Sequence, residues 1–353
     1  MNMHEQLVVT PTAWAHGAGN DTDVVVSSRI RLARNFAAQR FPNKQDREEA
    51  MQVWKHLSDF AAEHSDYQFY RLDDADSLDK EALLAKHLIS PAHAANDERL
   101  RALVLNNDLT QAIMVNEEDH LRMQTFRRGF DLGDAWQSAT LLDDQIGKYG
   151  DYAFTDRLGY LTSCPTNIGT GLRASVMLHL PAMTASRQTG LLQQVTKAGM
   201  TVRGFFGEGT EATGDLYQLS NQVTLGRSEE DILAGLSATT KQVVDMERKL
   251  REGYREQGEA FTDQCYRALG TLTYARRISS KEAYQLLSLI RLGASLGMLS
   301  GWTLDQVDKL YIMAHPGYVQ FANGKALTDA ERDRARAELI RKEILPGYKQ
   351  NKQ

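Results

Sequence analysis

The segment LRASVMLHL, residues 172–180, alternates without interruption between apolar side chains and a second set of residues. Successive side chains of a strand point to opposite faces, so the five apolar residues share one face. Arg173, Ser175, Met177 and His179 then share the other face. Such one-sided alternation is typical of an antiparallel sheet that packs one face and leaves the other available to a ligand.

Segments with the same period of two recur between helical patterns up to about residue 227. They cover residues 24–32, 102–106, 112–118, 158–164 and 216–225. Apolar residues at three- and four-residue spacing predict helices at about 44–64, 78–88, 134–148 and 184–198. The predicted fold class is therefore α+β, an antiparallel sheet flanked by helices.

From Ser228 onward the pattern is almost entirely helical. Ser228 precedes an acidic first turn, and further helices are predicted at about 261–276, 280–297, 303–313 and 328–345. Thr328 and Glu331 form a capping box for the last helix, and Pro346-Gly347 is expected to end it. We therefore predict a catalytic domain at 1–227 and a smaller all-helical domain at 228–353.

Composition excludes several classes of protein. The 353 residues carry a net charge of −5, which argues against a protein that coats nucleic acid or a membrane surface. Two cysteines, Cys164 and Cys265, form neither a disulfide framework nor a thiolate metal site, and the cytoplasm is the expected location. The N-terminal residues lack the pattern of a signal peptide, and no apolar run is long enough to span a membrane.

Common nucleotide-binding and hydrolytic motifs are missing. The sequence has no G-x-x-x-x-G-K-[ST], no HRD or DFG and no HExxH. Residues 169–174 formally match the dinucleotide pattern GxGxxA, but Cys-Pro-Thr-Asn precedes them in place of a buried strand.

Several arginines lie on or beside predicted strands. They are Arg29, Arg31, Arg122, Arg173 and Arg203. Burying guanidinium groups without partners is costly, and a nucleoside triphosphate with magnesium would supply the matching negative charge. The alternative is that these arginines pair with local acids such as Glu117, Glu118 and Asp119.

Two acidic positions accompany the arginines. If the strand persists through NEEDH (116–120), Glu117 and Glu118 point to opposite faces. Glu208 lies in a glycine-rich stretch typical of a flap that closes on a substrate, although it could equally be a solvated loop residue. Two carboxylates could orient a guanidinium group and accept a proton from it.

Four segments together resemble the phosphagen (guanidino) kinases, and among them the bacterial protein-arginine kinases. They are SSRIRLARN (27–35), NEEDHLR (116–122), CPTNIGTGLRASVMLHLP (164–181) and RGFFGEGT (203–210). The resemblance implies an ATP-dependent kinase that acts on protein arginine side chains. It also implies the family's antiparallel sheet flanked by helices.

The resemblance assigns residues to roles. The implied ATP-binding residues are Ser27, Ser28, Arg29, Ile30, Arg31, His87, Arg122, Arg173, Ala174, Ser175, Val176, Met177, Arg203, Gly204, Phe205, Phe206, Gly207 and Glu208. The implied catalytic residues are Glu118, Glu208 and Cys164. A packed helix histidine is the alternative for His87, and a small buried cysteine is the alternative for Cys164. Magnesium is expected to be held by the ATP phosphates, without direct protein ligands.

Two features separate the chain from small-molecule guanidino kinases. Those enzymes resemble one another in a helical domain before the SSR motif, which begins here at residue 27, so the acceptor side should be less enclosed. Residues 332–337 match the RDxxRA motif of protein-arginine kinases, which implies that Arg332, Asp333, Arg336 and Ala337 bind phosphoarginine as an allosteric effector. A surface ion-pair helix would have a similar sequence.

The resemblance further implies a cytoplasmic stress-response role in which arginine phosphorylation marks proteins for a Clp-type protease and relieves a stress-gene repressor. It implies a zinc-finger activator protein, a Clp-type ATPase and a homodimer or larger homo-oligomer, with a dimerisation surface on the helical domain. The alternatives are a kinase of free arginine and a non-catalytic phosphoarginine reader.

Overall fold

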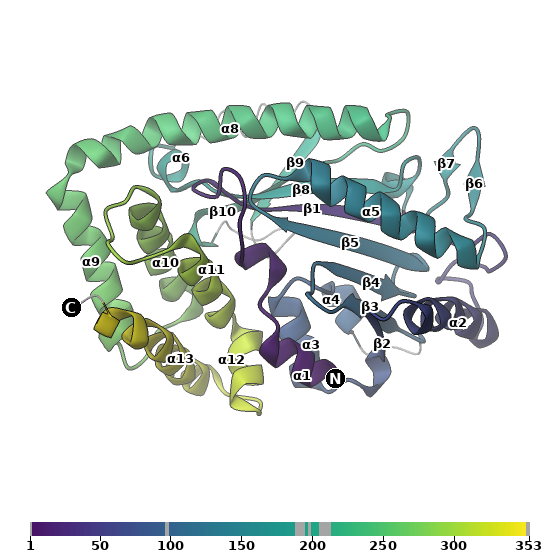
Figure 1. Ribbon diagram of the computed structural model, residues 1–353, viewed down its shortest axis with the longest axis horizontal. Coiled ribbons are helices and arrows are strands. Elements are labelled where there is room, and N and C mark those ends of the chain that lie inside the picture. The colour runs from purple at the N-terminus through teal and green to yellow at the C-terminus, as the bar shows by residue number, and fades with distance from the viewer. Residues whose placement is uncertain (1, 96–98, 188–194, 197–198, 205–212, 351–353) are drawn as a thin grey trace.

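A single antiparallel sheet organises the molecule. The computed structural model describes residues 2–95, 99–187, 195–196, 199–204 and 213–350 (Figure 1). The eight strands have the order β2-β3-β4-β5-β1-β8-β10-β9, and every neighbouring pair is antiparallel. They are β1 (Val25–Arg34), β2 (Tyr67–Arg71), β3 (Ala102–Asn106), β4 (Gln111–Val115), β5 (Leu121–Arg128), β8 (Leu172–His179), β9 (Met200–Gly204) and β10 (Leu216–Asn221). The predicted fold class is confirmed.

Three helices cover one face of this sheet: α2 (Arg47–Glu63), α5 (Leu132–Ile146) and α8 (Glu229–Gln257). Ile30 and Val176 project into the resulting core, where they meet Leu57, Leu142 and Leu236 of the three helices. The alternation of apolar residues along the strands places one apolar set beneath these helices and leaves the other set facing away.

The chain after residue 228 is helical, as expected. Ser228 caps α8 by accepting a hydrogen bond from the Asp231 backbone at 3.1 Å. The following helices are α9 (Glu259–Tyr274), α10 (Ser280–Ser295), α11 (Leu304–Met313), α12 (Pro316–Asn323) and α13 (Asp329–Gln350). The expected end at Pro346-Gly347 is wrong, because α13 continues to Gln350. A proline removes one backbone donor, and the helical path continues past it.

A second core joins the two parts of the chain. Leu103 and Met114 of the sheet lie in the same apolar cluster as Leu83 of α3 (Ser77–Ala85) and as Phe261 and Leu310 of the C-terminal helices. The N-terminal helix α1 (Met3–Val9) also packs against α3. The division predicted at residue 227 stays a prediction.

Buried ion pairs reinforce this junction. Asp308 of α11 lies 2.7 Å from Nε of Arg291 in α10 and 3.1 Å from Nη2 of Arg128 in β5. In α8, Glu247 lies 2.8 Å from Nε of Arg251. All five side chains are at most 3 % exposed. Each buried guanidinium is therefore matched by a carboxylate within the fold.

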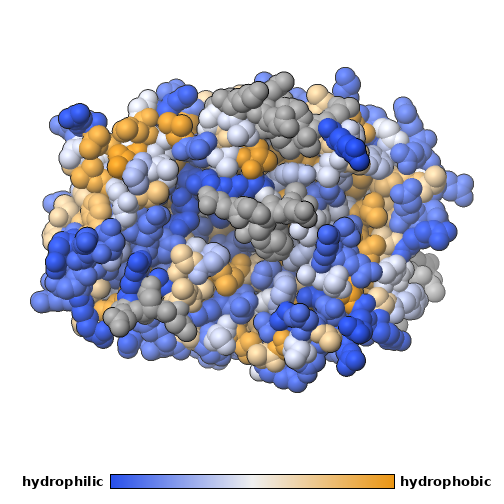
Figure 2. Space-filling model, turned by 180° about the vertical axis from the view of Figure 1, so that it is seen from behind, coloured by the Kyte–Doolittle hydropathy of each residue, from blue (hydrophilic) through white to orange (hydrophobic). Residues whose placement is uncertain are grey.

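The centre of the second sheet face is left open. Figure 2 shows this side of the molecule, where hydrophilic surface gathers around a recess near the middle. Among the described residues, no helix combines the length and the apolar character needed to cross a bilayer.

Candidate active site

Strand register gathers the predicted arginines on the open face. In β1, Arg29 is paired with Ser175 of β8, and Arg31 is paired with Arg173. Side chains of paired residues lie on the same face, and so do residues two apart on one strand. A cavity of about 170 Å³ is lined by the five arginines predicted from the sequence: Arg29, Arg31, Arg122, Arg173 and Arg203.

The two arginines of β1 in this cluster form no ion pairs among the described residues. Within the part of the chain that the structure describes, Arg31 has no hydrogen-bond or ion-pair partner. Arg29 donates a hydrogen bond only to neutral groups, including Ser175 Oγ at 3.3 Å. Withdrawal from solvent lowers the pKa of Arg29 to about 10, assisted by the positive charges of Arg122 and Arg173. The same causes lower the pKa of Arg31, so an anion placed here would stabilise both charges.

Arg122 differs from these two arginines. Its Nη1 lies 2.8 Å from a carboxylate oxygen of Glu117, so the alternative of pairing with a local acid holds for this residue. Burial alone would raise the pKa of Glu117, but the Arg122 charge and a hydrogen bond from Ser90 outweigh it and lower the pKa to about 2. Glu117 is therefore ionised and holds Arg122 in place.

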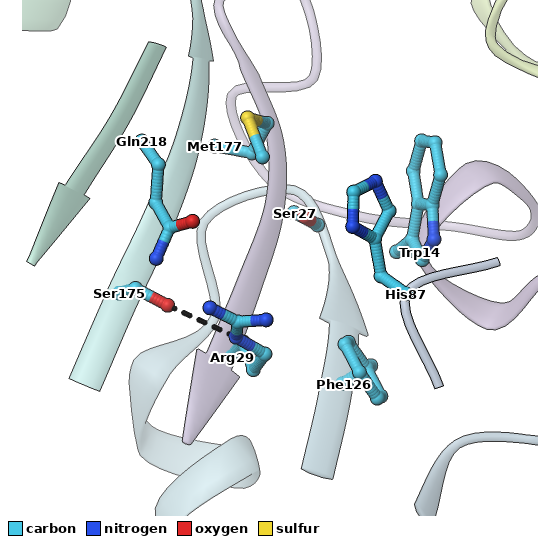
Figure 3. A pocket seen from close by; sticks show the side chains of 8 residues that line it. All are labelled: Trp14, Ser27, Arg29, His87, Phe126, Ser175, Met177 and Gln218. Carbon is cyan, nitrogen blue, oxygen red and sulfur yellow. Dashed lines mark hydrogen bonds between the residues drawn. The ribbon is translucent and has the colours of Figure 1, made fainter. Parts of the chain in front are cut away.

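An adjoining pocket contains aromatic and thioether groups (Figure 3). It is lined by Trp14, Ser27, Arg29, His87, Phe126, Ser175, Met177 and Gln218. His87 lies just beyond the end of α3, with φ of 60° and its ring 5.6 Å from that of Trp14, so it is not a packed helix histidine. Burial, followed by the charge of Arg29, lowers its pKa to about 3, and the imidazole is neutral.

Several residues predicted to bind ATP point their side chains the other way. Ile30, Ala174 and Val176 are fully buried in the core beneath α2, α5 and α8. Ser28 donates to the Gly129 carbonyl and accepts from the Asp131 amide, both at 2.9 Å, which fixes the turn into α5. These four side chains therefore do not face the open side of the sheet, because strand residues alternate between faces, and the assignment of the residues to ATP stays a prediction.

The NEEDH segment is a turn, and its expected strand geometry is wrong. β4 ends at Val115, Asn116 has φ of 57°, and β5 begins at Leu121. The turn leaves Glu117 buried and Glu118 exposed. Partial burial raises the pKa of Glu118, and the charges of Asp119 and Glu117 raise it further. A carboxylate with a raised pKa is the better proton acceptor.

Asp119 ties this turn to the segment that carries Cys164. Asp119 Oδ1 accepts hydrogen bonds from Asn35 Nδ2 and from the backbone amide of Ser163, both at 2.7 Å. Cys164 follows directly, is partly exposed and has its Sγ 3.0 Å from Thr166 Oγ1. The alternative of a small buried cysteine is therefore wrong for Cys164.

Sequence reasoning missed Trp14, Phe126, Gln218 and the tie made by Asp119. The register of β5 against β1 pairs Phe126 with Arg29, so a correct strand alignment would have found Phe126. Trp14 reaches the pocket from the N-terminal segment, and no local pattern indicates this. Phe205, Phe206, Gly207 and Glu208 lie outside the described residues, while Arg203 and Gly204 end β9.

The RDxxRA segment lies in α13, partly inside the helical region. Arg336 is 1 % exposed and donates to the carbonyls of Ala314 and Ile278 and to Asp333, each at 2.8 Å. Ala337 is also buried, whereas Arg332 pairs with Asp329 near the surface. The burial of Arg336 and Ala337 distinguishes this segment from a plain surface ion-pair helix, and phosphoarginine binding by residues 332–337 stays a prediction.

Comparisons with known proteins agree with this site. Residues 49–250 match the ATP:guanido phosphotransferase C-terminal catalytic domain, and residues 258–353 match the C-terminal domain of the protein-arginine kinase McsB. The protein-arginine kinase of Syntrophomonas wolfei is 44 % identical over 98 % of this chain and 99 % of its own. That of Bacillus subtilis is 42 % identical over 94 % of this chain and 93 % of its own.

Solved structures give the same result for the fold. The crystal structure of a lombricine kinase has a TM-score of 0.61 and 27 % identity, and the match covers 70 % of this chain and 71 % of that one. The arginine-lined face, the acidic turn beside it and the matches along nearly the whole length converge on one conclusion. The chain belongs to the ATP:guanido phosphotransferase family, among its protein-arginine kinases.

Proposed function

We propose that this chain transfers the γ-phosphoryl group of Mg-ATP to arginine side chains of proteins and forms phosphoarginine. The observation that carries the proposal is Arg31, a half-buried guanidinium with no hydrogen-bond or ion-pair partner among the described residues, which lines a cavity with four further arginines. A triphosphate would provide the missing negative charge. Arg–phosphate hydrogen bonds contribute roughly 1.5–3 kcal/mol each.

The two adjoining cavities are assigned to the two ends of a nucleotide, and the smaller one, of about 30 Å³, would have to widen to admit a base. Arg29, Arg31, Arg122, Arg173 and Arg203 would contact the phosphates, and magnesium would be held mainly by the phosphates themselves. The neighbouring pocket offers the ring of His87 beside Trp14, with Phe126 and Met177, as an apolar setting for the base (Figure 3). A neutral imidazole can stack on a base without adding charge.

The acceptor side is assigned to Glu118 and Cys164. A protonated guanidinium is a poor nucleophile, so a carboxylate must orient it and accept its proton as the N–P bond forms and the bond from the γ-phosphorus to the bridging oxygen of ADP breaks. Glu118 lies on an exposed turn with a raised pKa, which supports that role. Glu208 is proposed as the second carboxylate on the strength of the sequence resemblance.

The cellular setting is part of the proposal and is taken from the sequence resemblance described above. Phosphoarginine would mark proteins for a Clp-type protease in a cytoplasmic stress response, with a stress-gene repressor among the substrates. A zinc-finger protein would activate the kinase, and the helical region would support dimers or larger homo-oligomers. Residues 332–337 would bind phosphoarginine, and Asp333→Ala should then abolish the response to added phosphoarginine while basal transfer persists.

Labelled ATP tests the main proposal. The chain is incubated with [γ-³²P]ATP and an equal arginine concentration supplied as unfolded protein or as free arginine. Acid-labile label on protein, absent with Glu118→Ala, supports the proposal, and mass spectrometry at neutral pH should locate it on arginine. Label on free arginine alone would show a metabolite kinase. No transfer to either acceptor, with phosphoarginine still bound, would show a non-catalytic reader.

A further inference from the structure

Four large apolar side chains are exposed close to the acceptor side. Phe154 and Leu158 belong to the hairpin of β6 (Phe154–Thr155) and β7 (Gly159–Tyr160), which projects beyond α5 in Figure 1. Val223 and Leu225 follow the end of β10. Their exposed fractions are 54 %, 38 %, 48 % and 50 %, respectively. We call these four residues the apolar rim.

The two halves of the apolar rim are held together through Gly169. The Phe154 ring packs edge-on against Tyr160, with centroids 5.3 Å apart, and the Tyr160 amide donates to the Gly169 carbonyl at 2.8 Å. Gly169 has φ of 109°, and a Cβ there would lie 2.6 Å from the Thr224 carbonyl oxygen and 2.9 Å from Leu225 Cα. The hairpin and the segment after β10 therefore form one continuous surface.

This surface adjoins the residues assigned to the acceptor. The Thr224 hydroxyl shares its one proton between the carbonyl oxygens of Thr166, at 2.9 Å, and Ile168, at 2.6 Å, in the turn that begins at Cys164. On the other side of Cys164, Ser163 is bonded to Asp119, the neighbour of Glu118. A chain that places an arginine at Glu118 would therefore continue over the apolar rim.

The hairpin is anchored and not merely extended into solvent. The buried Arg34 guanidinium lies 3.5 Å from the centre of the Tyr160 ring and 2.7 Å from Asp143 of α5. The Tyr152 hydroxyl donates to the Asp143 carbonyl at 3.1 Å. A rigid surface loses little conformational entropy when a partner binds. The contribution of its apolar groups to affinity is therefore reduced little by the cost of ordering them.

Charge indicates the kind of partner. Glu118 is an exposed acid on the turn next to the apolar rim, while Asp119 beside it is buried, and the hairpin tip exposes Asp156 together with Arg157. A combination of exposed acids and apolar side chains fits a cationic segment with apolar neighbours. Four side chains are too few for a stable interface between two copies, which takes roughly 20–30 residues from each partner.

We propose that the apolar rim docks the substrate protein on either side of the target arginine, as an extended segment with an apolar residue a few positions from that arginine. The inference rests on the proposed function and adds the substrate class to it. It predicts a preference for unfolded chains, because an extended segment exposes an arginine and a neighbouring apolar side chain together.

The test compares a protein acceptor with a small one. Phe154→Ala/Leu158→Ala and Val223→Ala/Leu225→Ala are assayed with β-casein and with N-acetylarginine amide. Each double variant should raise KM for β-casein about tenfold, as expected for losing roughly 1.4 kcal/mol of apolar contact. The rate with N-acetylarginine amide and the KM for ATP should not change. The parent should phosphorylate peptides that carry Leu three residues from the arginine better than peptides that carry Ser there. The variants should phosphorylate the two peptides equally well.

Matched controls come from the far side of the sheet. Met51 of α2 and Leu141 of α5 are 54 % and 64 % exposed, and Met51→Ala/Leu141→Ala should leave every acceptor unaffected. An unchanged KM for β-casein in the rim variants would overturn the inference. So would an equal loss with both acceptors, or a change in oligomeric state by light scattering that accounts for the loss. If the parent phosphorylates only the small acceptor, the proposed function itself fails.

Discussion

Arginines are found in two regions of this molecule: in one they have acidic partners, and in the other some of them form no ion pair within the described part of the chain. At the junction of sheet and C-terminal helices, Arg291 and Arg128 share Asp308, and Arg251 has Glu247. On the open sheet face, Arg31 forms no hydrogen bond or ion pair among the described residues, and burial and neighbouring arginines lower its pKa despite the opposing charge of Glu117. An arginine stabilises the fold where a carboxylate neutralises its charge. Where no carboxylate pairs with it, an arginine provides a binding site for an anion.

Removing the shared carboxylate of the junction should have the largest effect. Asp308→Ala removes the carboxylate partner of Arg291 and one of the two carboxylates at Arg128, which keeps Asp305 at 2.8 Å, and breaking a buried pair in this way costs about 3–5 kcal/mol. Urea unfolding followed by circular dichroism measures the free energy. Asp263→Ala is the control, because its ion pair with Arg267 is exposed on both sides and its loss should change the free energy of unfolding little. Equal decreases in the free energy of unfolding in the two variants would contradict the difference expected between buried and exposed carboxylates.

The open face should behave in the opposite way. Arg31→Met should lower kcat/KM about 10²–10³-fold, because it removes a group that stabilises charge on the transferred phosphoryl. The free energy of unfolding should not fall, since the substitution relieves repulsion from Arg29, Arg122 and Arg173. Arg291→Met at the junction is the comparison variant and should lose stability. A large loss of stability in Arg31→Met would show that Arg31 has a structural partner.

ATP should stabilise the fold through the open face alone. At an ATP concentration of 100 times Kd, the free energy of unfolding should rise by about 2.7 kcal/mol in the parent, and calorimetry can follow the change. The increase should shrink in Arg31→Met at the same ATP concentration and persist in Asp308→Ala, whose absolute stability is lower. If ATP stabilises Arg31→Met as strongly as the parent, the arginine face is not the phosphate site.

The sequence was sufficient for features that depend on local periodicity. The alternation in 172–180 predicted the sheet and the face that carries Arg173, Ser175 and Met177. The two-residue spacing of Arg29 and Arg31 predicted that they share a face, and the register confirms that this is the face of Arg173. Each of these features follows from the geometry of one strand and requires no knowledge of its neighbours.

Features decided by distant contacts could not be predicted. Arg336 has the helical spacing of a surface residue but is buried against carbonyls 22 and 58 positions away. Trp14 reaches the His87 pocket from a segment without a local signal. The positive φ of Asn116 converts an expected strand into a turn, and this conformation decides which of Glu117 and Glu118 is exposed. Such outcomes depend on packing among elements that are far apart in the chain.

The smallest expected effect concerns the acceptor side, where the excess charge is negative. Burial, and then the charge of Asp119, raises the pKa of Glu118 above its ordinary value. If Glu118 must be ionised to accept the proton, kcat/KM falls as the pH drops through this raised pKa. Asp119→Asn keeps an oxygen for the Asn35 and Ser163 hydrogen bonds and removes the charge, so the acid limb should move to lower pH by less than about one unit. Asp156→Asn, at the exposed hairpin tip, should leave the limb in place. If the acid side of the pH profile of kcat/KM does not move in Asp119→Asn, another group accepts the proton. The carboxylate that acts opposite the arginine face would then not be Glu118.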